Sequence, residues 1–424
     1  MIDQPLALPC GVVLRNRIVK AAMSEQLADA RHGPSAELIA LYARWAGCGA
    51  AALITGNVMV DRAAVSEPGQ VVVESDIHLE LLKRWAVAAS AGGAATWMQI
   101  NHGGRQIPRL LNARPVAPSA VAMNNRLLFA RPRALGDAEI VAVVRAYAST
   151  AERAVQSGFG GVQLHAAHGY LASQFLSSLS NRRDDRWGGD AGGRSRFLLE
   201  LVDAVRAAIG SQAVLSVKLN ASDFQRGGIT PQESLDTVAA LSRSSIDLLE
   251  ISGGTFESAA MLGVPGGDGR DAARAATTRE AYFLDFARKA RARFDKPLMV
   301  TGGFRTRGAI DAALRSGAVD LVGLARPIVL DAQLPLRLLN GSTFDFAHEL
   351  QRPRWLLRGL SGGLAEVAWH TVQLWRCARG EVPDIGLGAP AAMARYLARQ
   401  TTQMRVRGKS ATGMAARRRE AGGA

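Results

Sequence analysis

The amino-acid sequence predicts an α/β fold, a (β/α)8 TIM barrel with an N-terminal hairpin and a C-terminal helical extension. Short apolar runs alternate with amphipathic helical stretches eight times along the chain. With 424 residues, the chain is long enough for one barrel with additions. A doubly wound open sheet is the alternative, and it lacks support because no G-x-G-x-x-G follows the first strand.

The elements are expected in the order of a barrel. Segment 6–17 has two short apolar stretches that turn at Pro9-Cys10-Gly11, which predicts a hairpin closing the bottom of the barrel. The first core strand ends in small residues, which let a flat ligand approach the backbone closely. The strands are expected at 18–24, 51–56, 96–100, 161–165, 214–220, 246–252, 297–302 and 319–324. The helices are expected at 38–46, 79–91, 137–157, 196–209, 231–241, 278–293, 308–316 and from 327 onward.

Two helix boundaries have clear sequence signals. Asp137 offers an N-cap for helix 137–157, and Gly158 offers a stop at its C-terminal end. Thr230-Pro231 is a cap followed by proline in the first turn, which predicts the start of helix 231–241.

Two long loops and a C-terminal segment interrupt this regularity. Loops 103–136 and 253–274 are too long for plain connections, and we expect them over the C-terminal face of the barrel. We interpret 1–340 as the barrel and 341–400 as a helical extension in which no chemistry is visible. Residues 401–424 are rich in arginine, glycine and alanine, and we interpret them as a basic flexible tail.

Composition restricts the classes of function. Three cysteines stand far apart, so the sequence contains no pattern for a zinc site, an iron–sulfur cluster or a disulfide framework. No run is apolar enough to cross a bilayer and no signal pattern opens the chain, so a cytoplasmic protein is expected. The formal net charge of +14 suggests an anionic partner, but part of the excess lies in the tail. We therefore expect no specific nucleic-acid or membrane partner.

The strongest candidate site follows the strand at 161–165. His165, His168 and Tyr170 stand at its C-terminal end, where the loops of a barrel carry out chemistry. Two imidazoles can hold a negative charge on a substrate oxygen, and a phenol can deliver a proton. One residue alone would more simply be a helix cap or a core residue. The three together, with N-R-R-D-D-R-W-G-G at 181–189, indicate a site.

The last two strands indicate a phosphate site. Gly302-Gly303 follows one strand, and Gly323 and Arg326 follow the next. In barrels these two loops often bind phosphate through backbone N–H groups. A tight turn is the plain alternative for the glycine pair.

The other end of such a ligand would reach the barrel axis. Gln99 offers a donor and an acceptor to the edge of a pyrimidine-like ring. Lys218 lies in an apolar strand and can stabilise negative charge on that ring. Ser24 can hydrogen-bond a ring carbonyl, or it is an ordinary serine at a strand end.

These residues resemble the Old Yellow Enzyme family, the NADH:flavin oxidoreductases and ene-reductases. The resemblance runs from about Leu6 to Leu330. It rests on N-R-I-V at 16–19, A-A-M-S at 21–24, T-G-N-V at 55–58, Gln99 with H-G-G-R at 102–105, H-A-A-H-G-Y at 165–170, N-R-R-D-D-R-W-G-G at 181–189, and T-G-G-F and G-L-A-R in the last two units.

The resemblance implies non-covalent FMN in an eightfold barrel, with NAD(P)H as the reductant. It implies that His165 and His168 hold the carbonyl oxygen of an enone-like substrate while Tyr170 protonates its α-carbon, in a ping-pong scheme. Residues 1–340 would then be an FMN-binding barrel. The residues expected to contact the cofactor are Ala22, Met23, Ser24, Gly56, Gln99, Lys218, Gly302, Gly303, Gly323, Ala325 and Arg326.

Two departures and several alternatives accompany the resemblance. Some relatives have cysteine at the position of Ser24, and arginine is commoner at the position of Lys218. Another acceptor, such as a quinone, a nitro compound or an RNA uridine, is one alternative function. A non-catalytic binding barrel with a basic tail is another. A homo-oligomer is left open, as are the choice between NADH and NADPH and the physiological substrate.

Overall fold

The computed structural model describes residues 1–223, 227–253, 283–304, 306–343 and 360–404, and for 360–363 the backbone alone. The loop expected at 253–274 lies outside these residues apart from its first position. So do the start of the helix expected at 278–293 and residues 344–359 of the helical extension expected at 341–400. Among the described residues, no helix is long and apolar enough to cross a membrane.

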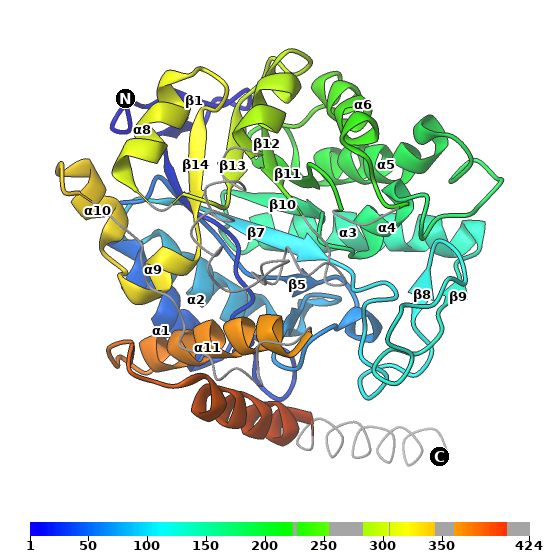
Figure 1. Cartoon of the computed structure of the whole chain (residues 1–424), viewed down its shortest axis with the longest axis horizontal. Helices are drawn as coiled ribbons and strands as arrows, with labels where there is room; N and C mark the ends of the chain where they lie inside the picture. Colours follow the sequence, from blue (N-terminus) through cyan, green and yellow to red (C-terminus); the bar gives the residue numbers. More distant parts are fainter. Residues whose placement is uncertain (224–226, 254–282, 305, 344–359, 405–424) are drawn as a thin grey trace.

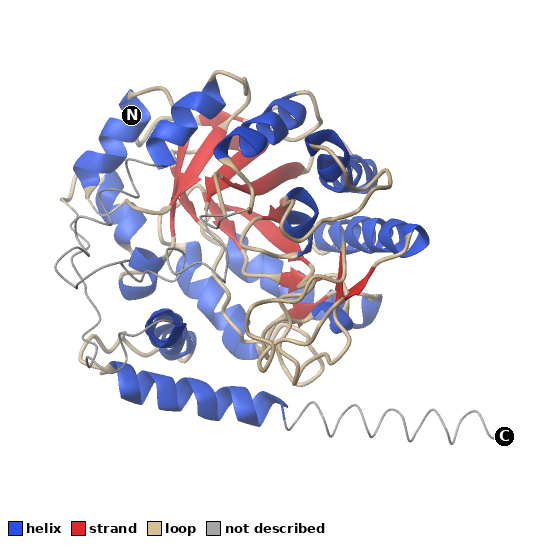
Figure 2. Ribbon diagram, turned by 45° about the vertical axis from the view of Figure 1, so that its right-hand side comes forward, coloured by secondary structure: helices blue, strands red, loops and turns tan. Residues whose placement is uncertain are grey.

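Eight parallel strands close into a barrel (Figures 1 and 2). Closure follows from pairing on both sides of each strand, including that of β10 with β7 and with β11. The strands are almost entirely buried because helices cover the outside and side chains fill the inside. The barrel strands are β3 (Ile18–Lys20), β4 (Ala52–Ile54), β7 (Ala95–Asn101), β10 (Gly161–Ala166), β11 (Val214–Asn220), β12 (Leu248–Ser252), β13 (Leu298–Thr301) and β14 (Leu321–Leu324).

A helical segment follows each barrel strand, which confirms the predicted (β/α)8 fold. Figure 2 shows these helices arranged around the strands. They are α1 (Ala36–Ala46), α2 (Leu79–Ser90), α3 (Asp137–Gln156), α5 (Ala191–Ile209), α6 (Pro231–Ser242), residues 283–291, α8 (Arg307–Arg315) and α9 (Arg326–Leu330). Shorter helices are α4 (Leu171–Leu176), α10 (Leu334–Leu339) and the single turns Arg62–Ala64 and Asp76–His78.

The predicted hairpin closes the bottom of the barrel. β1 (Leu6–Ala7) and β2 (Val13–Leu14) pair antiparallel around a turn in which Gly11 has a φ of +88°. Leu14 packs in one cluster with Val214, Leu248 and Leu321, the first residues of β11, β12 and β14. The hairpin therefore seals the N-terminal ends of the strands with apolar side chains and leaves the C-terminal ends for the site.

The two predicted helix caps differ in outcome. Thr230 caps α6 as expected, with its Oγ1 accepting from the Glu233 N–H at 3.2 Å. For α3 the prediction was wrong, because the N-cap is Gly136 and Asp137 is the first helical residue. Asp137 instead accepts from Trp187 Nε1 at 2.7 Å, which ties the helix to the segment that follows β10. The stop expected at Gly158 is present, with a φ of +95° there.

Loop 103–136 is more ordered than a plain loop. It contains β8 (Val116–Ala117) and β9 (Arg133–Ala134), which pair in parallel at the right of Figure 1. Two further short strands, β5 (Val58–Met59) and β6 (Val71–Val72), extend the sheet beside β7.

The C-terminal extension packs against the barrel. It comprises α11 (Leu360–Ala378) and a second helix, residues 389–404, which lie side by side in Figure 1. Trp375 of α11 stacks on Tyr396 of the second helix with ring centroids 5.9 Å apart. Residues 401–404, which the sequence predicted to open a flexible tail, continue this helix, and 405–424 lie outside the described residues.

Candidate active site

A cavity of about 400 Å³ opens at the C-terminal ends of the barrel strands. Gln99 of β7, His165 of β10, Lys218 of β11, Ser252 of β12 and Thr301 of β13 all line it. Each of these residues stands at or near the last position of its strand, so the parallel barrel brings together side chains that are far apart in sequence.

The two histidines and the tyrosine form one cluster in this cavity. The ring centroid of His165 lies 5.0 Å from that of His168 and 4.9 Å from that of Tyr170, in edge-to-face arrangements. His168 has a φ of +61°, which turns the chain directly after β10 and lets both His168 and Tyr170 reach the cavity. The predicted catalytic triplet is therefore assembled in space.

Both imidazoles are uncharged at neutral pH. Desolvation, and after it the charge of Lys218, lowers the pKa of His168 to about 3. Desolvation, then His168 and Lys218, hold the pKa of His165 well below its ordinary value. A neutral imidazole has one N–H donor, so each ring can offer a single hydrogen bond to a substrate oxygen.

Hydrogen bonds identify which nitrogen of His165 has the proton. His165 Nδ1 accepts from the Ala167 N–H at 3.2 Å, which leaves the proton on Nε2. His168 is held from two other strands: its backbone N–H donates to Asn220 Oδ1 at 3.2 Å, and its Nε2 lies 3.0 Å from Ser252 Oγ. If the Ser252 hydroxyl donates its hydrogen to Nε2, the His168 proton must lie on Nδ1.

Tyr170 is a protonated phenol at neutral pH. Desolvation raises its pKa above the ordinary value of a phenol, and the nearby Glu67 carboxyl raises it further. Asn57 Nδ2 donates to the Tyr170 oxygen at 3.3 Å, which occupies a lone pair and leaves the phenolic proton available. Tyr170 therefore keeps a proton that it can donate.

A chain of buried polar groups supports the floor of the cavity. Gln99 Nε2 donates to Gln163 Oε1 at 2.7 Å, and Gln163 Nε2 donates to Glu250 Oε2 at 2.8 Å. The Lys218 ammonium pairs with Glu250 Oε1 at 2.8 Å, and both side chains are buried. Sequence reasoning found Gln99 and Lys218 but missed Glu250, which compensates the charge of the lysine.

The predicted phosphate loops line the other end of the cavity. Gly302 and Gly303 have φ values of +117° and +88°, a conformation that favours glycine. A Cβ at Gly323 would overlap Thr301 Oγ1, a buried oxygen for which the described residues provide no hydrogen-bond partner. This end suits a phosphate group because it has small residues, the Thr301 hydroxyl and the positive charge of the exposed residue Arg326.

All but one of the predicted site residues meet in this cavity. Besides the catalytic triplet, its lining includes Ala22, Met23, Ser24, Gln99, Lys218, Gly302, Gly303, Gly323, Ala325 and Arg326. Gly56 instead lines a smaller neighbouring cavity, and its N–H donates to Glu25 Oε1 at 3.0 Å. A Cβ there would overlap the Met23 carbonyl and Glu25. Close packing explains this glycine, and its contact with a cofactor stays a prediction.

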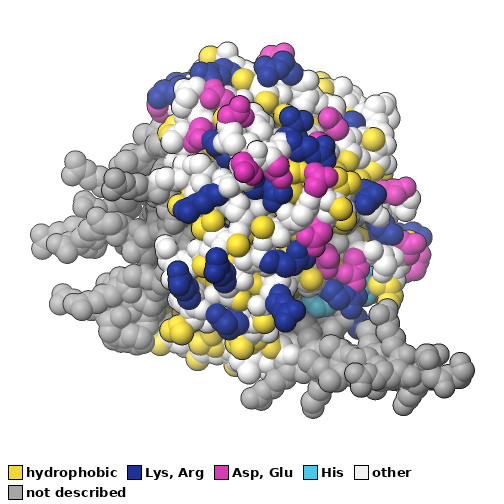
Figure 3. Space-filling model, turned by 90° about the vertical axis from the view of Figure 1, so that its right-hand side faces the viewer, with side chains coloured by type: hydrophobic (Ala, Val, Ile, Leu, Met, Phe, Trp, Pro, Cys, Tyr) yellow, Lys and Arg dark blue, Asp and Glu magenta, His cyan; other side chains and the backbone are white. Residues whose placement is uncertain are grey.

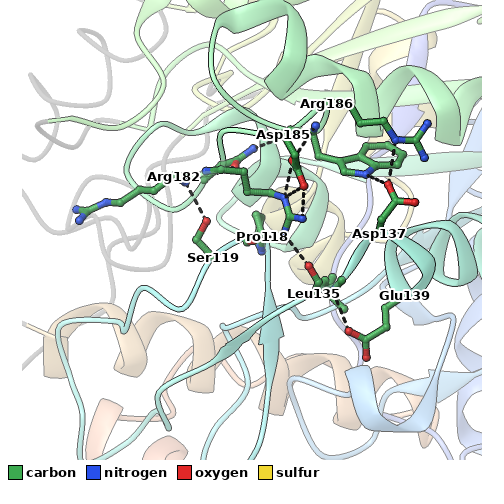
Figure 4. A network of polar contacts seen from close by, with 12 residues as sticks. Pro118, Ser119, Leu135, Asp137, Glu139, Arg182, Asp185 and Arg186 are labelled. Atoms are coloured by element: carbon green, nitrogen blue, oxygen red, sulfur yellow. Dashed lines mark hydrogen bonds and ion pairs between the residues drawn. The ribbon is translucent and has the colours of Figure 1, made fainter.

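The segment 181–189, which the sequence associated with the site, holds a loop in place instead. Arg183 donates to the carbonyl oxygens of Pro118 at 2.8 Å and Leu135 at 2.6 Å, and the Arg182 N–H donates to Ser119 Oγ at 2.9 Å (Figure 4). None of its described residues lines the cavity. Its motif therefore anchors the β8–β9 loop.

Sequence reasoning missed several groups in the lining. Asn57 lay within the quoted T-G-N-V motif, but neither Glu67 nor Ser252 stood out from its neighbours. No chemistry was visible in the sequence of the C-terminal extension, yet α11 contributes five residues to the lining. These are Glu366, Val367, His370, Thr371 and Leu374.

Comparisons with known proteins agree with this geometry. The model of the NADH:flavin oxidoreductase / NADH oxidase family matches residues 2–343. The NADH-dependent flavin oxidoreductase iliE of Hypocrea jecorina (strain QM6a) is 35% identical over 396 residues, which cover 86% of this chain and 96% of that protein.

Solved structures share the fold. The Old Yellow Enzyme homologue from Zymomonas mobilis has a TM-score of 0.69 at 24% identity, with 84% of this chain and 98% of that chain covered. Morphinone reductase in complex with tetrahydroNAD has a TM-score of 0.65 at 25% identity, with 81% and 92% covered.

Proposed function

We propose that this chain, which belongs to the NADH:flavin oxidoreductase / NADH oxidase family and is an NAD(P)H-dependent FMN oxidoreductase of the Old Yellow Enzyme type, reduces the C=C bond of α,β-unsaturated carbonyl compounds. The observation that carries the proposal is the cluster of His165, His168 and Tyr170 in one cavity. Two neutral N–H donors and one phenolic proton are the groups that an enone needs from a protein.

The residues of the cavity fit FMN. The open glycine loops, Thr301 and Arg326 suit the phosphate, and Gln99 and Lys218 suit the polar edge of the ring. When bound, the flavin supplies the hydride-transfer chemistry that amino-acid side chains lack.

The side chains of this protein would act on the carbonyl and on the α-carbon. His165 Nε2–H and a second N–H from His168 would bind the carbonyl oxygen and stabilise the negative charge that grows on it. Because both imidazoles are neutral, they stabilise this charge by hydrogen bonding and do not transfer a proton to it. Tyr170 would give its proton to the α-carbon and then regain one from solvent.

The reductant would use the same cavity in a separate half-reaction. The donors that hold an enone oxygen can equally hold the carboxamide oxygen of a nicotinamide. A neighbour of known structure was solved with tetrahydroNAD, which supports a nicotinamide in such a cavity. A shared cavity implies ping-pong kinetics, because reductant and enone would exclude one another.

Anaerobic half-reactions test the proposal. The flavin is reduced with NADH or NADPH, 2-cyclohexenone is added, and flavin reoxidation is followed by absorbance. His165→Ala should bind enone more weakly and slow reoxidation about 10²- to 10³-fold, the usual cost of one oxyanion donor. Tyr170→Phe should keep enone binding but reoxidise about 10²-fold more slowly, because it has lost the general acid.

Tyr147→Phe is the matched control, since Tyr147 is also buried but does not line the cavity. A flavin that responds to a quinone or oxygen, but not to enones, would contradict the proposed substrate class. Equal rates for Tyr170→Phe and Tyr147→Phe would contradict the role of Tyr170.

A further inference from the structure

The hydroxyl of Ser24 is already engaged by another side chain of the cavity. Ser24 lines the cavity together with Ala22 and Met23, just after β3. Its Oγ donates a hydrogen bond to Glu67 Oε2, and Glu67 lines the same cavity. Because a serine hydroxyl has a single hydrogen to donate, Ser24 in this arrangement can offer a ligand only the lone pairs of its oxygen.

Hydrogen bonds hold Glu67 where it can accept from Ser24. Gln70 Nε2 donates to Glu67 Oε2 at 3.4 Å. Gln70 Oε1 in turn accepts from the backbone N–H groups of Ser66 at 2.9 Å and of Glu67 at 3.2 Å. The carboxyl group of Glu67 is therefore part of a short turn whose backbone and side chains are bonded to one another.

This turn packs closely against the segment that contains Ser24. The Ala28 N–H donates to the Gly69 carbonyl at 2.7 Å. Gly69 has a φ of +86°, and a Cβ at this position would overlap the carbonyl of Gln26. Two segments that are distant in sequence thus form one packed unit, which fixes the pairing of Ser24 with Glu67.

The direction of the Ser24 hydroxyl matters for a flavin ring. Reduction adds electron density to the ring system and its carbonyl oxygens, and protein hydrogen bonds and charges around the ring tune how stable the reduced form is. A hydroxyl that donates to a ring carbonyl stabilises this density and favours the reduced form. A hydroxyl that donates to Glu67 instead leaves the reduced form without that hydrogen bond.

We propose that Glu67 sets the reduction potential of the FMN by withdrawing the Ser24 hydroxyl from the flavin ring. By accepting this hydrogen bond, Glu67 keeps the reduction potential lower than Ser24 alone would make it. Glu67 is thus a positioning residue that acts through Ser24. The inference rests on FMN in this cavity and on no particular acceptor, so it goes beyond the proposed reduction of enones.

A double-mutant cycle isolates the contribution of the hydroxyl. The ratio of reduced to oxidised bound FMN is measured by anaerobic equilibration with reference dyes of known potential. The four proteins are the wild type, Ser24→Ala, Glu67→Leu and the double variant. A tenfold change in this ratio corresponds to about 30 mV for a two-electron couple. No enone enters the assay, so its result does not depend on the substrate class.

Glu67→Leu should raise the ratio of reduced to oxidised FMN at least about 10-fold at a given potential, because the freed hydroxyl can donate to the ring. Ser24→Ala should change the ratio less than about 3-fold in the wild type, where the hydroxyl is engaged, but lower it at least about 10-fold in the Glu67→Leu background. Any effect of the Glu67 charge is common to both Glu67→Leu proteins and cancels in the cycle.

Ser66→Ala in both backgrounds is the matched control, because Ser66 is a buried serine next to Glu67 and lies outside the described lining of the cavity. Glu67→Ala repeats the cycle if Glu67→Leu folds poorly. Equal effects of Ser24→Ala in both backgrounds, or a Glu67→Leu ratio equal to that of the wild type, would overturn the proposal. If the cycle behaves as expected but enones fail to reoxidise the flavin, the substrate class is wrong and the role of Glu67 stands.

Discussion

The hydroxyl of Ser252 should determine which nitrogen of His168 has the proton. His168 Nε2 lies 3.0 Å from Ser252 Oγ, and Ser252 ends β12, so the barrel positions this hydroxyl without help from a loop. If Ser252 donates, Nε2 must accept and the proton must be on Nδ1. His165 has the opposite arrangement, with Nδ1 accepting and Nε2 protonated.

Ser252→Ala removes this constraint with little change in volume. A hydrogen bond of this type contributes about 1 kcal/mol net, which corresponds to a roughly 5-fold bias between the two tautomers. Without it, a larger share of His168 would have its proton on Nε2. We therefore expect enone affinity to fall about 3- to 10-fold, with the rate at saturation changed less.

Two measurements check this prediction. The ¹⁵N shifts of labelled histidine report the tautomer directly, and enone titration of the oxidised protein reports affinity. Ser252→Thr should restore both, since it keeps the hydroxyl. Ser234→Ala is the matched control, because Ser234 is also a buried serine and its Oγ donates to the Asn220 carbonyl, not to a histidine. If the His168 shifts of Ser252→Ala equal those of Ser234→Ala, the assignment of the tautomer is wrong.

Two further predictions concern cofactor affinity and pH. Gly323→Ala should weaken FMN binding at least about 10-fold, because the added Cβ would overlap Thr301 Oγ1. Gly308→Ala is the control and should leave FMN binding unchanged, because a Cβ at Gly308 meets no atom. Fluorescence titration of the apoprotein with FMN measures both affinities. The pKa of His168 is lowered to about 3 and that of His102 to about 4, so the unfolded chain binds more protons below pH 6.5. Stability should be fully present above pH 6.5 and fall as pH drops toward 4, as urea unfolding at several pH values would show; a flat profile would contradict it.

The barrel could be predicted from the sequence because its signals are local. A buried parallel strand is a short apolar run, and a helix follows each run, so eight repeats suffice to identify the fold. The predicted catalytic cluster was also local, since His165, His168 and Tyr170 lie within six residues at one strand end. The position of an N-cap is harder to predict from local sequence. Gly136 and Asp137 are both acceptable N-caps, and Asp137 instead accepts a hydrogen bond from Trp187, which is 50 residues away.

Residues whose role depends on a distant partner could not be predicted in the same way. Glu250 reads as one polar residue in an apolar strand until the barrel places it beside Lys218. The motif at 181–189 was misread for the same reason, since its arginines contact carbonyl oxygens of a loop about 50 to 65 residues away. On the side of the molecule that carries this loop, basic and acidic side chains are mixed over the upper part, whereas several basic side chains stand together in the lower part, a pattern that the net charge alone does not reveal (Figure 3).

The extension shows most clearly where sequence reasoning stops. The apolar residues of α11 indicate a packed helix, and its tryptophans do pack, but periodicity cannot tell whether the polar face meets solvent or a cavity. The hydrogen bonds from α11 and its neighbouring helix to Glu25 and Gln26 help to bring that face to the site. Because barrels build their sites from variable additions at the strand ends, such an extension can reshape the cavity while the strand ends stay the same.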